Sequence, residues 1–173
     1  MRATQEPVGP VVSASHLANG AMPALSELEF ALVVLGNAYN RWIAACSNAA
    51  HGGGLSSMEV QILHAVNHRE RAKSQAALCM MFNIEDTHVV AYALKKLEAL
   101  GLVESGRRGK EKTVSITEKG TSHCLEYRRL REKLLIEPIR SLGLDEARVS
   151  EIAALMRVMS GQYDQATRAA ASM

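Results

Sequence analysis

Residues 86–117 decide the fold of this chain and read DTHVVAYALKKLEALGLVESGRRGKEKTVSIT. Asp86 or Thr87 can cap a helix at its start, and Gly101 stands where a left-handed residue commonly ends one. Between them the apolar residues repeat with the helical period and define one face. That face comprises Val89, Val90, Ala93, Leu94, Leu97 and Leu100. The stretch therefore predicts an amphipathic helix with one side on a core.

The opposite side of this helix is polar and basic. It carries Thr87, His88, Ala91, Tyr92 and Lys95, with Lys96 at its edge. Hydrogen-bonding and cationic groups near the N-terminal end are what a recognition helix brings to base edges in the major groove. We therefore predict base contacts from Thr87, His88, Tyr92 and Lys95, with Lys96 beside them.

A basic β-hairpin follows the helix directly. Residues 102–105 and 113–116 are short, alternating and rich in β-formers, and they flank the loop GRRGK at 106–110. A thin arm with positive charge at its end suits phosphates or the minor groove. The hairpin is thus predicted to be the wing of a winged helix-turn-helix. Its DNA-binding residues would be Arg107, Arg108, Lys110 and Lys112.

Two shorter helices precede the recognition helix. Ser56 and Glu59 have the spacing of a capping box and start a helix that runs to about Asn67. Ser74 is placed to cap a second helix, which runs through Phe82. The connector between them is basic and is predicted to form a second phosphate clamp. That clamp comprises Arg69, Arg71, Lys73 and Ser74.

Longer helices flank this motif. Apolar residues alternate in steps of four and three from Leu28 to Ala49, a coiled-coil-like stripe. A further helix is predicted from Thr117 towards Pro138, and a last one begins at Asp145. Their apolar stripes would be exposed in a monomer, which predicts a homodimer. The predicted dimerisation residues are Leu28, Leu32, Leu35, Ile152, Leu155, Met159 and Tyr163.

The predicted fold is mainly α with a small β-hairpin wing. Its regions are a disordered N-terminal tail (1–23), a dimerisation helix (24–51), the winged helix-turn-helix (55–120) and C-terminal dimerisation helices (121–173). The partners expected are double-stranded DNA and a second copy of the chain.

Composition narrows the class of protein. The net charge of +2 means that a basic footprint must come from local clusters. Three scattered cysteines and the lack of an apolar leader predict a cytoplasmic protein, and no segment is predicted to enter a membrane. Catalytic and nucleotide-binding motifs are missing, so neither an enzyme nor a cofactor is predicted.

The sequence resembles the MarR family of transcriptional regulators. The resemblance rests on LEALGLV at 97–103, the basic hairpin, and VSITEKG at 114–120. It implies a homodimeric repressor on a pseudo-palindromic operator, with half-sites about 10 bp apart. It also implies a small aromatic or anionic effector, for which the candidate residues are Tyr39, Arg41, Trp42 and His64.

Two departures from the family pattern affect recognition of DNA. The wing lacks the Asp-x-Arg element that many members carry, which leaves open which residue enters the minor groove. Tyr92 stands where arginine is frequent in the family, so the usual sequence preference is not expected.

Other functions remain open at this stage. A winged helix can serve as a protein–protein module without binding DNA. His64 and His68 lie four apart, a spacing that can share a metal, but no nearby ligand completes a site, so no metal is predicted. Cys46 could sense oxidants, although its place in the apolar stripe favours a buried thiol.

Overall fold

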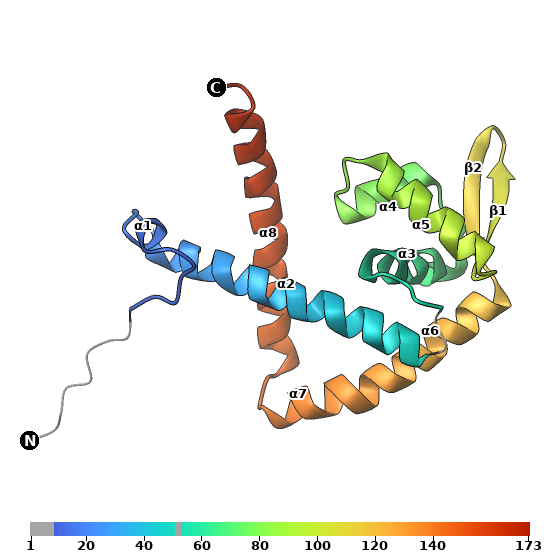
Figure 1. The fold of residues 1–173 in the computed structure, drawn as a ribbon, viewed down its shortest axis with the longest axis horizontal. Helices are drawn as coiled ribbons and strands as arrows, with labels where there is room; N and C mark the ends of the chain where they lie inside the picture. The colour runs from blue at the N-terminus through green and yellow to red at the C-terminus, as the bar shows by residue number, and fades with distance from the viewer. Residues whose placement is uncertain (1–8, 51–52) are drawn as a thin grey trace, which may run out of the picture. The chain divides into compact units, whose positions relative to one another are not determined.

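The computed structural model describes residues 9–50 and 53–173, which are mainly helical with one two-stranded sheet (Figure 1). These residues divide into two compact units at the boundary between Tyr127 and Arg128. The winged helix lies in the first unit, together with the long helix that precedes it. The predicted tail lies partly outside the described residues, which begin at Gly9.

The described part of the predicted tail contains one short helix. Residues Ser15–Ala18 form a short helix, α1. The Ser26 hydroxyl donates to the Leu17 carbonyl at 2.8 Å, and the Val11 amide donates to Glu27 at 3.4 Å. These hydrogen bonds tie the segment to the start of the next helix, a local effect that composition alone does not reveal.

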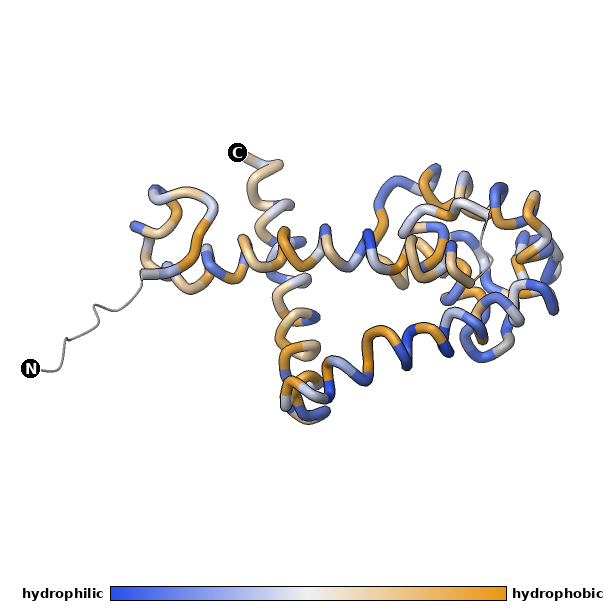
Figure 2. The backbone as a smooth tube through the Cα atoms, turned by 60° about the horizontal axis from the view of Figure 1, so that its bottom comes forward, coloured by the Kyte–Doolittle hydropathy of each residue, from blue (hydrophilic) through white to orange (hydrophobic). Residues whose placement is uncertain are grey.

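Helix α2 (Pro23–Ala49) begins with a proline at its first position, where the missing N–H costs nothing. Only its C-terminal part is buried, through Ile43, Cys46 and Ser47. The N-terminal half carries exposed apolar side chains and extends away from the winged helix (Figure 1). Hydrophobic segments recur along this extended half in Figure 2.

Three helices build the compact part of the first unit: α3 (Ser57–Asn67), α4 (Gln75–Phe82) and α5 (Thr87–Ala99). The predicted capping box is confirmed, because the Glu59 amide donates to Ser56 Oγ and the Ser56 amide donates to Glu59 Oε2. Ser74 accepts from the Ala77 amide at 3.3 Å and caps α4 as predicted. Asn83 ends α4 in the left-handed conformation.

The core lies between these helices and the hairpin. Its fully buried side chains are Val60, Ile62, Leu63, Val66, Leu78, Val90 and Leu97. Burial of each is worth about 1.5–3 kcal/mol, so this cluster stabilises the fold more than any surface contact does. One apolar residue departs from the predicted face: Val89 is 40% exposed, since it lies at the outer edge of α5.

The wing is longer than predicted. Strands β1 (Val103–Arg108) and β2 (Glu111–Ile116) pair antiparallel up to a turn at Gly109 and Lys110. The turn can be this tight because Gly109 adopts a positive φ of 64°. Arg107 and Arg108 are therefore strand residues, and their side chains point to opposite faces.

A third segment joins the hairpin. The Lys73 amide donates to the Val114 carbonyl, and the Val114 amide donates to the Lys73 carbonyl. This bridge ties the wing to the connector between α3 and α4. The wing is consequently held at its base from both sides of the motif.

The helix after the wing was predicted to run towards Pro138, and in the structure helical turns extend to Ser141. It comprises α6 (Glu118–Arg131), a π-helical turn (Glu132–Ile136) and α7 (Glu137–Ser141). The wide turn lies directly before the proline, whose missing N–H interrupts the regular ladder of hydrogen bonds.

The second unit contains α8 (Glu146–Ala170), which Asp145 caps by accepting from the Arg148 amide at 2.7 Å. No residue of α8 is buried. Across residues 9–50 and 53–173, no helix combines the length and apolar character needed to cross a membrane.

A close backbone junction connects the wing to α6. The Leu102 carbonyl accepts from the Thr117 amide at 3.2 Å, and Thr117 Oγ accepts from the Gly120 amide at 3.0 Å. Gly120 lies against that carbonyl with no space for a side chain, because a Cβ there would collide with the Leu102 oxygen and the Ile116 side chain. The direction in which α6 leaves the wing thus depends on a glycine at this position.

The change Gly120→Ala should lower the free energy of unfolding by about 2–3 kcal/mol, because the backbone must shift to admit the methyl group. Gly161→Ala on α8 is the matched control. A Cβ there meets nothing within 4 Å, so the helix should be unchanged or stabilised by up to about 1 kcal/mol. Urea unfolding of the three proteins measures both effects, and equal stability of the two variants would refute the close junction.

Candidate nucleic-acid interface

Helix α5 turns a polar surface outward because its other side is anchored in the core. Val90, Ala93 and Leu97 are buried. The residues predicted to contact bases are all exposed on the remaining surface: Thr87, His88, Tyr92 and Lys95. Tyr92 has 74% of its surface exposed. This arrangement gives α5 the outward donors and acceptors that base edges require.

The start of α5 is fixed by two hydrogen bonds. The Asp86 carboxylate accepts from the His88 amide at 2.9 Å, as its predicted cap role requires. Gln75 Nε2, at the start of α4, donates to the Thr87 carbonyl at 2.8 Å. The two helices of the helix-turn-helix are thereby joined at their N-terminal ends.

The end of α5 is equally well defined. Gly101 has a φ of 69°, its amide donates to the Glu98 carbonyl, and the Leu102 amide donates to the Leu97 carbonyl. This pattern is a Schellman motif and confirms the predicted left-handed cap. It directs the chain from the recognition helix into the wing.

Several of the residues predicted to contact DNA form hydrogen bonds to other groups of the protein. Lys96 Nζ donates to Glu59 Oε2 and to the Gly54 carbonyl, both at 2.9 Å. Burial alone would raise the pKa of Glu59, but hydrogen bonds from Lys96 and Ser56 outweigh it and lower the pKa. Lys96 is therefore a structural residue at the edge of α5.

Lys73 also has a structural role. Its Nζ donates to the carbonyls of Val66, His68 and Arg71 at 3.1, 2.6 and 3.1 Å. Burial lowers the pKa of this amine. The ammonium group holds together the turn at Arg69, whose positive φ of 60° is unusual for a residue with a side chain.

Ser74 and Arg108, two further predicted phosphate contacts, also have partners within the chain. Arg108 pairs with Glu111 at 2.8 Å across the tip of the wing. The hydrogen bond from Arg108, and a second one from the Ser74 side chain, lower the pKa of Glu111. Ser74 is nearly buried, so its hydroxyl serves the cap of α4 and the wing.

The remaining predicted cations have no hydrogen-bond or ion-pair partner in the described part of the chain. They are Arg69, Arg71, Lys95, Arg107, Lys110 and Lys112. All six are exposed, and they lie on the connector, on α5 and on the wing. These are the groups whose charge is available to a phosphate backbone.

Sequence reasoning missed a buried polar cluster near the C-terminal end of α2. His123 of α6 lies with its Nε2 3.0 Å from Ser47 Oγ. His64 of α3 contacts the ring of Tyr127 edge-on, with the centroids 4.5 Å apart. The His64 Nε2 atom is buried without a hydrogen-bond partner. Nothing in the local sequence pattern of Ser47 and His123 pointed to their contact.

The three cysteines are buried and form no disulfide within residues 9–50 and 53–173, and burial raises the pKa of Cys124 to about 11. Cys46 was expected to be buried and is, with its thiol 3.7 Å from the Tyr127 carbonyl. His68 is exposed directly after α3, whereas His64 is half-buried with its Nε2 atom fully enclosed. No group of three or more metal-ligating side chains occurs within residues 9–50 and 53–173.

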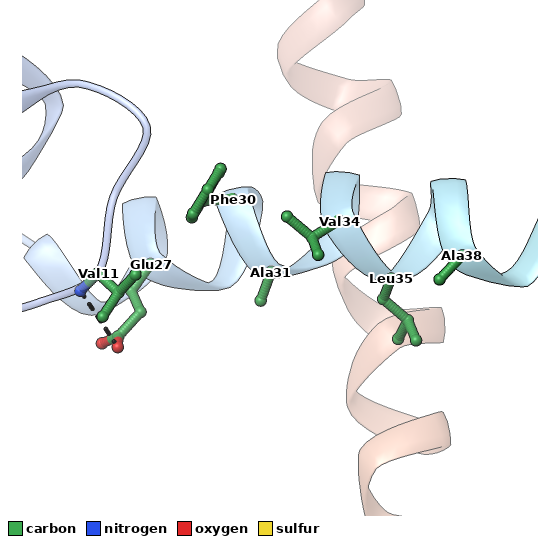
Figure 3. A pocket seen from close by; sticks show the side chains of 7 residues that line it. All are labelled: Val11, Glu27, Phe30, Ala31, Val34, Leu35 and Ala38. Atoms are coloured by element: carbon green, nitrogen blue, oxygen red, sulfur yellow. Dashed lines mark hydrogen bonds between the residues drawn. The ribbon is translucent and has the colours of Figure 1, made fainter.

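An open apolar pocket of about 420 Å³ lies along the N-terminal half of α2. Figure 3 shows its side chains, which are Val11, Glu27, Phe30, Ala31, Val34, Leu35 and Ala38. Its lining includes none of the predicted effector residues Tyr39, Arg41, Trp42 and His64. Of that set, Tyr39 and Arg41 are exposed, whereas His64 belongs to the buried cluster.

Comparison with known proteins agrees with this geometry. Residues 55–120 match the family model described as a winged helix DNA-binding domain. A MarR transcriptional regulator from Methanosarcina mazei superposes with a TM-score of 0.64 at 18% identity, over 87% of this chain and 97% of that one. The chain has the MarR fold. The predicted resemblance is thereby confirmed at the level of the fold.

Two further MarR-fold structures are informative. A mutant MarR from E. coli, complexed with operator DNA, has a TM-score of 0.64 at 13% identity, over 82% of this chain and 99% of that one. CouR from Rhodococcus jostii, bound to p-coumaroyl-CoA, has a TM-score of 0.61 at 14% identity, over 76% and 90%. No curated protein matches the chain in sequence.

The buried imidazole predicts a pH dependence of stability. Burial, and secondarily the nearby His123, lower the pKa of His64 from 6.5 to about 4. Between about pH 6.5 and pH 4, His64 is protonated in the unfolded chain but neutral in the folded protein. The free energy of unfolding therefore falls as the pH drops through this range. The titration of His64 should lower the free energy of unfolding by about 2 kcal/mol between about pH 7 and pH 4.5.

The change His64→Phe keeps an aromatic ring beside Tyr127 but removes the titration. Its free energy of unfolding should vary less between these two pH values than that of the wild type, by about 2 kcal/mol. Urea unfolding at each pH measures the difference. An unchanged pH dependence in the variant would show that His64 titrates normally.

Proposed function

We propose that this MarR-fold protein is a sequence-specific DNA-binding transcriptional regulator that acts in the cytoplasm as a homodimer. The proposal rests on the basic side chains that lack an ion-pair partner among the described residues. The exposed surface of α5 and the face of the wing beside it hold cations that nothing in the described chain neutralises. A polyanion is the partner that such a surface favours.

The dimer is proposed from two apolar stripes that the chain leaves exposed. On α2, Leu28, Leu32 and Leu35 are 39%, 44% and 59% exposed. On α8, Ile152 and Leu155 are half exposed, with Met159 and Tyr163 on the same stripe. Exposed apolar surface of this extent is unusual for a monomer and is stabilised by burial against a second copy.

Twofold symmetry determines the form of the DNA target. Two recognition helices related by a twofold axis meet successive major grooves, so the operator should be a pseudo-palindrome with half-sites about 10 bp apart. The structure of the E. coli MarR with operator DNA supports this proposal by likeness of fold. Thr87, His88 and Tyr92 would contact the bases.

Regulation would follow from occupancy of the operator, which blocks transcription sterically. An effector that favours a different spacing of the recognition helices would release the DNA. CouR, which is bound to p-coumaroyl-CoA, supports effector binding in this fold. Tyr39, Arg41, Trp42 and His64 remain the proposed effector residues, and the unpartnered His64 Nε2 offers one polar contact.

A protein-docking winged helix is the second candidate function. Met80 and Met81 at the end of α4 are 84% and 51% exposed, and flexible apolar side chains of this kind suit a protein partner. This alternative assigns no role to the unpaired cations of the wing. DNA binding is preferred because it accounts for them.

DNA binding is tested by measuring affinity for sheared genomic DNA and for the upstream region of the gene at several salt concentrations. The affinity should fall steeply between about 50 mM and 200 mM salt. Arg107→Ala should weaken binding about tenfold and make the salt dependence shallower, because Arg107 has no internal partner. Arg108→Ala, the matched control, should have a smaller effect, since Glu111 already neutralises Arg108.

The combined change Arg107→Ala/Arg108→Ala should not exceed the sum of the two single effects by much. If the wild type shows no salt-sensitive binding even at about 50 mM salt, the DNA hypothesis is refuted. A protein partner docking on α4 would then be the next function to test.

The homodimer is tested by analytical ultracentrifugation at micromolar concentration. Leu32→Asp places a charge in the apolar stripe of α2 and should shift the protein from dimer to monomer. Met80→Asp introduces the same charge on α4 and should leave the dimer intact. A monomeric wild type, or equal behaviour of the two variants, would contradict the proposed interface.

A further inference from the structure

A cleft of about 220 Å³ separates α5 from the wing. Ala91, Leu94 and Lys95 line it from α5, and Ser105 and Lys112 line it from the two strands. The small side chains of Ala91 and Ser105 leave the space open. The two lysines come from different elements, one from α5 and one from β2, so a basic residue lines the cleft on each side.

The register of the wing adds a third positive charge. Arg107 lies directly opposite Lys112 in the antiparallel pair, so both side chains project from the same face of the hairpin. Like charges directly opposite each other destabilise a sheet. On the other face, by contrast, Arg108 lies opposite Glu111 and forms an ion pair. The face beside the cleft therefore concentrates positive charge that an anion would relieve.

The carboxylate that also lines the cleft does not neutralise these groups. Glu98 Oε1 accepts from the Ser105 amide at 3.2 Å, which anchors strand β1 to α5. Lys95 and Lys112 have no hydrogen-bond or ion-pair partner among the described residues. Two unpaired lysines thus line one small cleft, and the single carboxylate that lines it with them is already engaged.

We propose that this cleft binds one phosphate group, held jointly by Lys95 from the recognition helix and Lys112 from the wing. Where the phosphate is a phosphodiester of a bound duplex, the inference rests on the proposed function. It then makes the cleft the point that clamps the DNA backbone between helix and wing. A free phosphate has the same chemistry and would compete for the site.

The slope of log K against log salt reports how many DNA phosphates the protein neutralises. If both lysines hold one phosphate, Lys95→Gln/Lys112→Gln lowers the slope of log K against log salt by about 0.9. Each single change lowers it by less, since the other lysine still neutralises the group. A double variant that loses about twice that slope, in equal steps, would assign the lysines to separate phosphates and overturn the shared site.

Filling the cleft tests the site without removing a charge. Ala91→Leu should reduce the slope by about the same 0.9 and weaken DNA binding several-fold, although both lysines remain. Ala99→Leu, an exposed position on the same helix outside the cleft, should change neither. Lys96→Gln is the control for charge, because Lys96 is already paired with Glu59. Circular dichroism and thermal unfolding establish that each variant is folded, and an unaffected Ala91→Leu protein would refute the proposal.

A second arm identifies the source of the phosphate. Inorganic phosphate is titrated into the ¹⁵N-labelled protein against chloride at equal ionic strength, with Lys95→Gln/Lys112→Gln as control. Shifts of the Ser105 and Thr113 amides in the wild type alone would assign the cleft to free phosphate as well as to DNA. If the double variant lowers the salt slope but inorganic phosphate causes no such shifts, the cleft binds only the phosphates of the DNA backbone.

Failure of the proposal and failure of the proposed function give different results. Salt-sensitive DNA binding that neither Ala91→Leu nor the lysine changes affect would sustain DNA binding and overturn the cleft. Phosphate-dependent shifts in a protein that does not bind DNA would sustain the cleft and overturn the DNA hypothesis.

Discussion

The burial of Val90, Ala93 and Leu97 against α3 and α4 is the constraint on which the rest of the winged helix depends. With one side of α5 committed to the core, its rotation about its own axis is set. The residues left outside are then the only ones that α5 can offer to a partner. The same anchoring fixes Gly101 at the end of the helix, and the Schellman motif there directs the chain into the wing. The apolar packing of α5 therefore sets the recognition surface and the start of the wing, and the Lys73–Val114 bridge holds the base of the wing as well.

Positive charge in this protein has two separate uses. Lys73 and Lys96 form hydrogen bonds to backbone carbonyls, and Lys96 also to Glu59, and they hold loops in place. Lys95 and Lys112 remain unpaired beside a cleft. Lysines adjacent in sequence thus differ completely in role, because one faces α3 and the other faces outward. A near-neutral chain can in this way still present a concentrated positive surface to a polyanion.

The long helix α2 serves two environments along its length. Its C-terminal turns contribute Cys46 and Ser47 to the buried cluster with His123 and Tyr127. Its N-terminal half exposes several leucines and valines and lines the open pocket of Figure 3. A helix that is buried at one end and exposes apolar side chains at the other is typical of an element whose exposed part packs against a second chain. This contrast is the physical basis for the proposed dimer.

The sequence by itself determined the features that depend on near neighbours. The capping box at Ser56, the end of α5 at Gly101 and the buried side of α5 follow from local spacing and backbone preference. Tertiary structure decided which polar groups are paired, because the partners lie far apart in sequence. Lys96 meets Glu59 across 37 positions, and Ser47 meets His123 across 76. No local pattern reports such contacts, so only the folded chain separates the lysines that hold the structure from those left free to bind a phosphate.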